Sequence, residues 1–159
     1  MGNTRENPQI DAVGYTDKMW RKFKEIVLNF STYTDLSPDV EARRRVNQAL
    51  RDRQALNLDQ WFEFFWRPRG MTRAVVAFVY TYLQKYSGLH IGRVRPGDRL
   101  EQDLQFTLVC WFDWQMSLCE DFLGCFGVDI SDRVDLSAFS TVEEFVKFLN
   151  HQLLVINPT

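Results

Sequence analysis

Few side chains in this 159-residue chain have the types and spacing that catalysis requires. Glu120 and Asp121 are adjacent carboxylates, and paired carboxylates are a common basis of general acid–base chemistry. Neighbouring residues of a helix point about 100° apart, so these two do not form a catalytic dyad by themselves. The pair instead indicates an acidic, solvated helix face that a protein partner could recognise.

The cysteines and histidines do not suggest a metal or a nucleophile. Cys110, Cys119 and Cys125 are nine and six residues apart, which places them on different faces of a helix. We therefore expect Cys110 and Cys119 to be small buried side chains and Cys125 to be reachable from solvent. An odd number of cysteines without a CxxC spacing favours reduced thiols, and hence a cytoplasmic protein. The sequence predicts no enzyme and no metal site.

Composition and charge narrow the class of partner. Hydrophobic residues make up 45% of the chain and the formal net charge is −2. This composition predicts a folded core, and the charge argues against general nucleic-acid binding, although "WFEFFWRPRG" with Arg43, Arg44 and Arg45 could stack a single strand. No apolar run approaches the ~20 residues of a membrane span. Residues 1–73 hold 13 basic and 10 acidic side chains, whereas residues 74–159 hold 6 basic and 11 acidic side chains. The acidic excess of residues 74–159 suits a basic partner.

The hydrophobic spacing predicts an all-α fold. Apolar residues recur at helical intervals in 16–30, 37–54, 58–67, 72–87, 107–126 and 140–154. Residues 1–15 are polar and predicted to be disordered, residues 16–71 form an N-terminal helical extension, and residues 72–156 form a four-helix domain. We expect the extension to share one globule with that domain, because the aromatic side chains of 61–66 need a common core.

Several start and stop signals support these helices. Ser37 is a candidate N-cap before Pro38, and Val40 is spaced for burial. Thr72 can cap the helix that Gly88 ends. The Gly/Pro-punctuated link between residues 89 and 106 is too irregular for a helix, but four of its side chains are expected to anchor it to the core: Ile91, Val94, Leu100 and Leu104. A capping box is expected at the start of the last helix, formed by Ser140 with Glu143 or by Thr141 with Glu144.

Residues 72–154 resemble the acyl carrier protein fold. The motifs that carry the resemblance are "DRLEQDL" before the central helix, "CFGVDIS" after it and "FSTVEEFVKFL" at the last helix. The small bacterial DUF1493 family of unknown function is more similar still, and it shares "DRL..DL" and "FGVD". The resemblance implies a carrier-like bundle. In carriers, the exposed acidic side of the central helix is recognised by basic patches on partners.

The resemblance also implies a serine that holds 4′-phosphopantetheine, and this sequence lacks it at the expected place. In carriers the serine begins the central helix, about fourteen residues before the phenylalanine that corresponds to Phe126. That count arrives at Phe112, within "CWFDW". Ser117 is the only serine followed by leucine in the helix, and it is expected to be exposed and mid-helix, a position that a transferase would not recognise.

A helical projection of 107–126 assigns the two faces of the central helix. The expected buried stripe consists of Leu108, Phe112, Met116, Cys119, Leu123 and Phe126. Asp113, Ser117, Glu120, Asp121 and Gly124 are expected on the opposite face. Trp114 and Leu118 then lie at its apolar margin, where Trp114 is either an anchor for a partner or packs on residues 1–71.

The sequence thus favours a non-enzymatic protein-interaction module without a prosthetic arm. Its predicted partner-binding residues are Asp113, Trp114, Leu118, Glu120 and Asp121. One alternative is a divergent carrier that bears 4′-phosphopantetheine on Ser117. Another is a regulatory or immunity-type protein that neutralises a basic partner.

Overall fold

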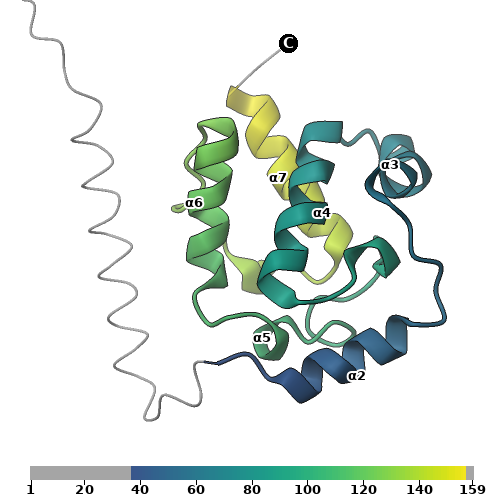
Figure 1. Ribbon diagram of the computed structural model, residues 1–159. Helices are drawn as coiled ribbons and strands as arrows, with labels where there is room; N and C mark the ends of the chain where they lie inside the picture. The colour runs from purple at the N-terminus through teal and green to yellow at the C-terminus, as the bar shows by residue number, and fades with distance from the viewer. Residues whose placement is uncertain (1–36, 157–159) are drawn as a thin grey trace, which may run out of the picture. The chain divides into compact units, whose positions relative to one another are not determined.

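The computed structural model describes residues 37–156, and it is all-α there (Figure 1). Its helices are α2 (Val40–Leu50), α3 (Leu58–Trp61), α4 (Arg73–Ser87), α5 (Phe106–Val109), α6 (Trp114–Phe126) and α7 (Val142–Ile156). Within these residues the only β-pairing is an isolated antiparallel bridge between Arg99 and Thr141. The disorder predicted for 1–15 and the helix predicted for 16–30 lie outside the described residues.

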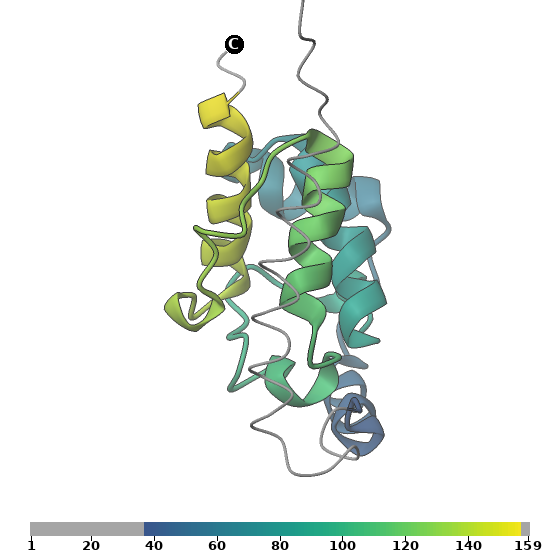
Figure 2. The same ribbon diagram turned by 90° about the vertical axis from the view of Figure 1, so that its left-hand side faces the viewer.

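The described helices form one compact unit that starts at Ser37. In it α4 packs against both α6 and α7, and α2 packs against α5. Figures 1 and 2 both place α2 and α5 at one end of the bundle, away from the C-terminal end of α7. Residues 37–71 therefore belong to the same globule as residues 72–156. No helix within residues 37–156 combines the length and the apolar character needed to cross a bilayer.

Helix α4 follows its sequence signals closely. Thr72 is its N-cap residue, and Gly88 ends it with a left-handed φ of 67°. The Thr72 side chain does not cap the helix; its hydroxyl donates instead to Asn150 on α7, at 2.8 Å. Valines at 75, 76 and 79 are fully buried. The central element of the bundle was thus predictable from local signals, and its cap also ties it to α7.

Helix α2 begins two residues later than its sequence suggested. The N-cap is Asp39, whose carboxylate accepts from the Ala42 amide at 3.0 Å, so the prediction of Ser37 as the cap is wrong. Ala42, Val46 and Leu50 face the core at helical spacing. That phase leaves Val40 on the solvent side, which corrects the expectation that it is buried.

The aromatic segment is less buried than predicted. It continues from α3 through a π-helical stretch, η2 (Phe62–Trp66), to a 3₁₀ turn, η3 (Arg67–Arg69). Trp61 and Trp66 are fully buried and meet edge to face at 5.2 Å. Phe64 points outward and is 71% exposed. The expectation that the aromatic side chains of 61–66 are buried in a common core is therefore wrong for Phe64.

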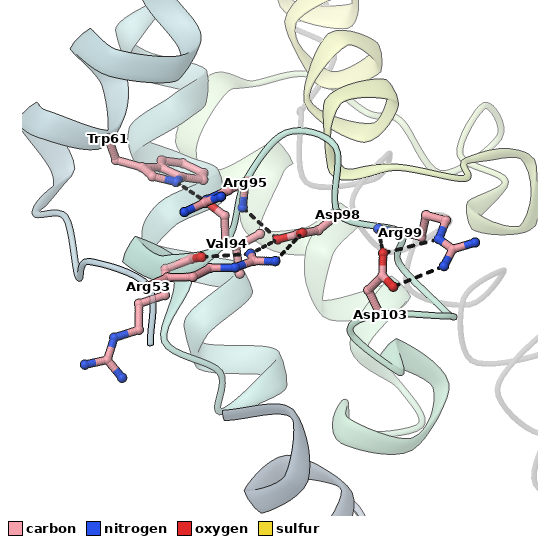
Figure 3. Close-up of polar contacts among 8 residues, drawn as sticks. Arg53, Trp61, Val94, Arg95, Asp98, Arg99 and Asp103 are labelled. Atoms are coloured by element: carbon pink, nitrogen blue, oxygen red, sulfur yellow. Dashed lines mark hydrogen bonds and ion pairs between the residues drawn. The ribbon is translucent and has the colours of Figure 1, made fainter. Parts of the chain in front are cut away.

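The link between α4 and α5 is irregular but firmly anchored. All four predicted anchors, Ile91, Val94, Leu100 and Leu104, are buried. Figure 3 shows the polar contacts that fix its backbone: Arg53 makes a bidentate pair with Asp98 at 2.6 and 2.9 Å, and Trp61 donates to the Val94 carbonyl at 2.8 Å. Asp98 is nearly buried and also accepts from the Arg95 amide at 2.7 Å.

The "DRLEQDL" motif therefore has a structural role here. Its first aspartate, Asp98, holds the link, while Arg99 and Asp103 form an ion pair at 3.2 Å across one turn (Figure 3). The leucines of the motif enter the core. At the start of α7, the Thr141 hydroxyl accepts from the Glu144 amide at 3.3 Å, and Glu144 accepts from the Ser140 amide at 2.7 Å. Of the two predicted capping boxes, the one with Thr141 and Glu144 contributes to that start, whereas the Glu143 amide donates to the Pro96 carbonyl instead of to Ser140.

Candidate functional site

The predicted central helix is broken, and the break lies at the candidate site. A single helix was expected over 107–126, but α5 ends at Val109 and α6 begins at Trp114. Cys110 is extended between them, with φ −85° and ψ 155°. No glycine or proline marks the break, so the local sequence gave no sign of it.

The break changes which face of α6 is buried. Its inward residues are Trp114, Leu118 and Phe122, four residues apart, together with Cys119. Of the predicted stripe only Cys119 is fully buried, whereas Leu108 is half-exposed. The prediction failed because the helical phase counted from residue 107 does not continue through the extended residues.

Two predicted partner-binding residues are therefore core residues. Trp114 stacks on Phe106 at 5.5 Å and lies 6.3 Å from the Tyr86 ring, so it packs against α4 and α5 rather than facing a partner. Leu118 is 0% exposed. The expectation that Trp114 and Leu118 lie at an exposed margin is wrong, because packing on α4 and α5 draws this face inward.

The three predicted acidic residues have different environments. The Asp121 carboxylate accepts from the Tyr86 hydroxyl at 2.5 Å and lies 3.5 Å from the Lys85 ammonium. Burial, followed by the hydrogen bond to Asp121, raises the pKa of Tyr86. Glu120 is exposed, and Asp113 is half-buried at the N-cap position of α6 without capping the helix. Glu120 and Asp113 are thus the acidic groups available to a partner.

Two apolar side chains near the break are exposed, which the helical projection did not predict. Trp111 is 50% exposed on the link between α5 and α6, and Leu108 is 46% exposed on the last turn of α5. The Asp39 amide donates to the Leu108 carbonyl at 2.9 Å, which holds the first turn of α2 against α5. We call the following residues the junction surface: Val40, Leu108, Trp111, Asp113 and Glu120.

The same junction lacks the groups that a prosthetic arm needs. Trp114, a buried tryptophan, occupies the first position of α6, where a carrier has its serine. Ser117 is the fourth residue of α6 and half-buried, which corrects the expectation that it is exposed. Its amide already bonds to the Asp113 carbonyl at 3.1 Å, as an interior helical residue does. These residues do not fit 4′-phosphopantetheine.

The cysteines behave as predicted. Cys110 and Cys119 are buried, Cys125 is exposed, and none of the three forms a disulfide. Burial raises the pKa of the Cys110 thiol, which disfavours a reactive thiolate. The Cys125 sulfur lies 3.5 Å from the Tyr82 hydroxyl. Among the residues that the structure describes, no three metal-ligating side chains come together.

The first arginine of the run on α2 makes its contacts within the fold. Arg43 donates from Nε to the Val109 carbonyl at 2.7 Å and from Nη2 to the Tyr86 carbonyl at 3.3 Å. It therefore ties α2 to α4 and α5. Arg44 and Arg45 are exposed.

At the α5–α6 break, the half-exposed Trp111 precedes Asp113 by two residues in the chain. Comparisons with protein-family models, curated proteins and solved structures find no match to this chain. The arguments about function consequently rest on the described residues themselves.

Proposed function

We propose that this protein is a non-enzymatic interaction module that binds a basic protein partner on the junction surface. The single observation that carries the proposal is the half-exposed Trp111 at the α5–α6 break. Tryptophan is enriched among residues that dominate binding energy, and a soluble protein gains nothing for its own core by leaving one in water.

Charge supports a basic partner. Asp113 and Glu120 lie seven residues apart, close to two helical turns, so both face the same side of α6. Neither carboxylate has a cationic partner among the described residues, in contrast to Asp121. Unpaired acids around an aromatic anchor steer a basic surface towards it.

The resemblance to carriers supports the same surface. We infer a carrier-like scaffold, related to DUF1493 proteins, in which the face beside the start of the central helix still binds partners although the arm is lost. The absence of a disulfide among the three cysteines supports a reducing compartment such as the cytoplasm. A regulatory or immunity-type protein that neutralises a basic partner would use this surface in the same way, and the identity of the partner distinguishes the two.

Charge reversal tests the proposal. The tagged wild-type protein is used for affinity capture from cells of its source, beside Asp113→Lys, Glu120→Lys and the double variant. The partner should be lost progressively, and raising the salt concentration should weaken wild-type capture. Asp132→Lys is the matched control, because Asp132 is an exposed acid outside the junction surface. Equal capture by the double variant and the control would reject this surface.

A further inference from the structure

A pocket of about 520 Å³ lies beside the aromatic segment, and none of its lining residues belongs to the junction surface. Its volume is within the range of small-molecule sites and too small for a folded partner. The lining brings together Phe64 and Phe65 with Arg93 and Arg95, and the remaining residues are mostly amides and small or aliphatic groups.

The floor of the pocket is built by a close backbone crossing. The Leu56 amide donates to the Gly92 carbonyl at 3.0 Å, and the Leu56 carbonyl accepts from the Tyr80 hydroxyl at 2.8 Å. A Cβ atom on Gly92 would lie 2.1 Å from the Leu56 carbonyl oxygen, so only glycine permits this approach. This crossing fixes the backbone of two segments that line the pocket.

The two arginines project from a rigid backbone. Arg53 donates to the Arg93 carbonyl at 3.1 Å. The Arg95 amide donates to the Asp98 carboxylate at 2.7 Å, as Figure 3 shows. No carboxylate among the described residues pairs with either guanidinium, and the buried Nε of Arg93 finds no acceptor there. The charges of the two guanidinium groups are therefore not balanced by the described residues, and an anion in the pocket would balance them.

The pocket is also lined by one acidic side chain and by two phenylalanine rings. Glu63 also lines the pocket, but its carboxylate accepts from Arg67 Nη1 at 3.1 and 2.8 Å and is neutralised. Phe64 and Phe65 meet edge to face at 5.0 Å, which leaves the 71%-exposed Phe64 ring open to solvent. An open aromatic ring offers a stacking surface to another flat ring.

We propose that this pocket binds a small anionic ligand that carries a flat aromatic ring. The guanidinium groups of Arg93 and Arg95 hold the phosphate or carboxylate, because the planar fork of arginine matches both. Phe64 stacks on the ring. The pocket thus gives the module a ligand site that is independent of its protein-binding surface.

Calorimetric titration of the full chain tests the proposal. The two joined probes are adenosine monophosphate, which joins an aromatic ring to a phosphate, and indole-3-acetate, which joins an aromatic ring to a carboxylate. The two half-probes are adenosine, which has the ring without the phosphate, and ribose 5-phosphate, which has the phosphate without the ring. At least one joined probe should bind, with each half-probe about tenfold weaker or more. Preference for the nucleotide indicates a phosphate ligand, and preference for indole-3-acetate indicates a carboxylate.

Variants locate the binding. Arg95→Gln and Phe64→Ala change exposed side chains and should each weaken binding about tenfold without loss of helical circular dichroism. Arg45→Gln, an exposed arginine on α2, should bind as the wild type does. The proposal is overturned if neither joined probe binds at millimolar concentration, if half-probes bind equally well, or if all three variants bind alike. Much tighter binding of an oligonucleotide or an acidic peptide would also overturn it.

Discussion

The Tyr86 hydroxyl on α4 donates to the Asp121 carboxylate on α6 across 2.5 Å. This contact joins two helices of the bundle and removes Asp121 from the acidic surface that the sequence predicted. We expect Asp121→Ala to lower the free energy of unfolding by about 2 kcal/mol, because the buried Tyr86 phenol loses its acceptor. Urea denaturation measures this, and exposed Glu120→Ala should cost less than about 0.5 kcal/mol. Equal effects would show that Asp121 is a surface residue.

The same contact predicts a dependence of stability on alkaline pH. Burial and the bond to Asp121 raise the pKa of Tyr86 in the folded protein, whereas an unfolded tyrosine titrates near about 10. A raised folded-state pKa gives stability that is present below about pH 10 and is lost as the pH rises beyond it. Urea denaturation across this range should show a smaller loss for Tyr86→Phe than for the wild type. Parallel pH profiles would contradict the assignment.

The bidentate pair of Arg53 and Asp98 predicts a large loss of stability on truncation. Asp98 is nearly buried and would keep an uncompensated charge in Arg53→Ala, so we expect a cost of roughly 3 kcal/mol. The exposed Arg45→Ala serves as the control and should change stability by less than about 0.5 kcal/mol. A loss as small as the control's would mean that the hydrophobic anchors hold the link alone.

The absence of a serine at the start of α6 predicts that no prosthetic arm is attached. Co-expression with a promiscuous phosphopantetheinyl transferase should leave the intact mass unchanged, since Ser117 is half-buried within the helix. A known carrier protein expressed in the same cells provides the positive control. A mass gain of one phosphopantetheine that disappears in Ser117→Ala would instead make the chain a divergent carrier.

Capping residues, a helix-ending glycine and the spacing of apolar residues predicted several parts of the fold. The bounds of α4, the start of α7 and the four anchors of the link follow from caps, glycine and apolar spacing. The start of α6 did not follow, because stacking of Trp114 on Phe106 and its packing beside Tyr86 decide it, and these contacts join residues from different elements. The phase error then misplaced Trp114 and Leu118.

The candidate sites were only partly predictable for the same reason. Glu120 and Asp113 could be assigned to an outer helix face, but the exposure of Trp111 depends on the break in the chain. The pocket brings residues 54–56 and 60–65 together with 92–95. No sequence pattern links these segments, although Gly92 and the closely spaced arginines after it were a weak signal.

Photo-crosslinking in cells of the source most directly tests binding at the junction surface. A photoreactive phenylalanine replaces Trp111 in one variant and Val155, 55% exposed on the last turn of α7, in another. Figure 1 places that turn at the other end of the bundle from α5. We predict a discrete adduct to a basic protein from position 111, absent from position 155 and reduced by Glu120→Lys. No adduct from position 111, or the same adducts from both positions, would contradict the proposed docking surface.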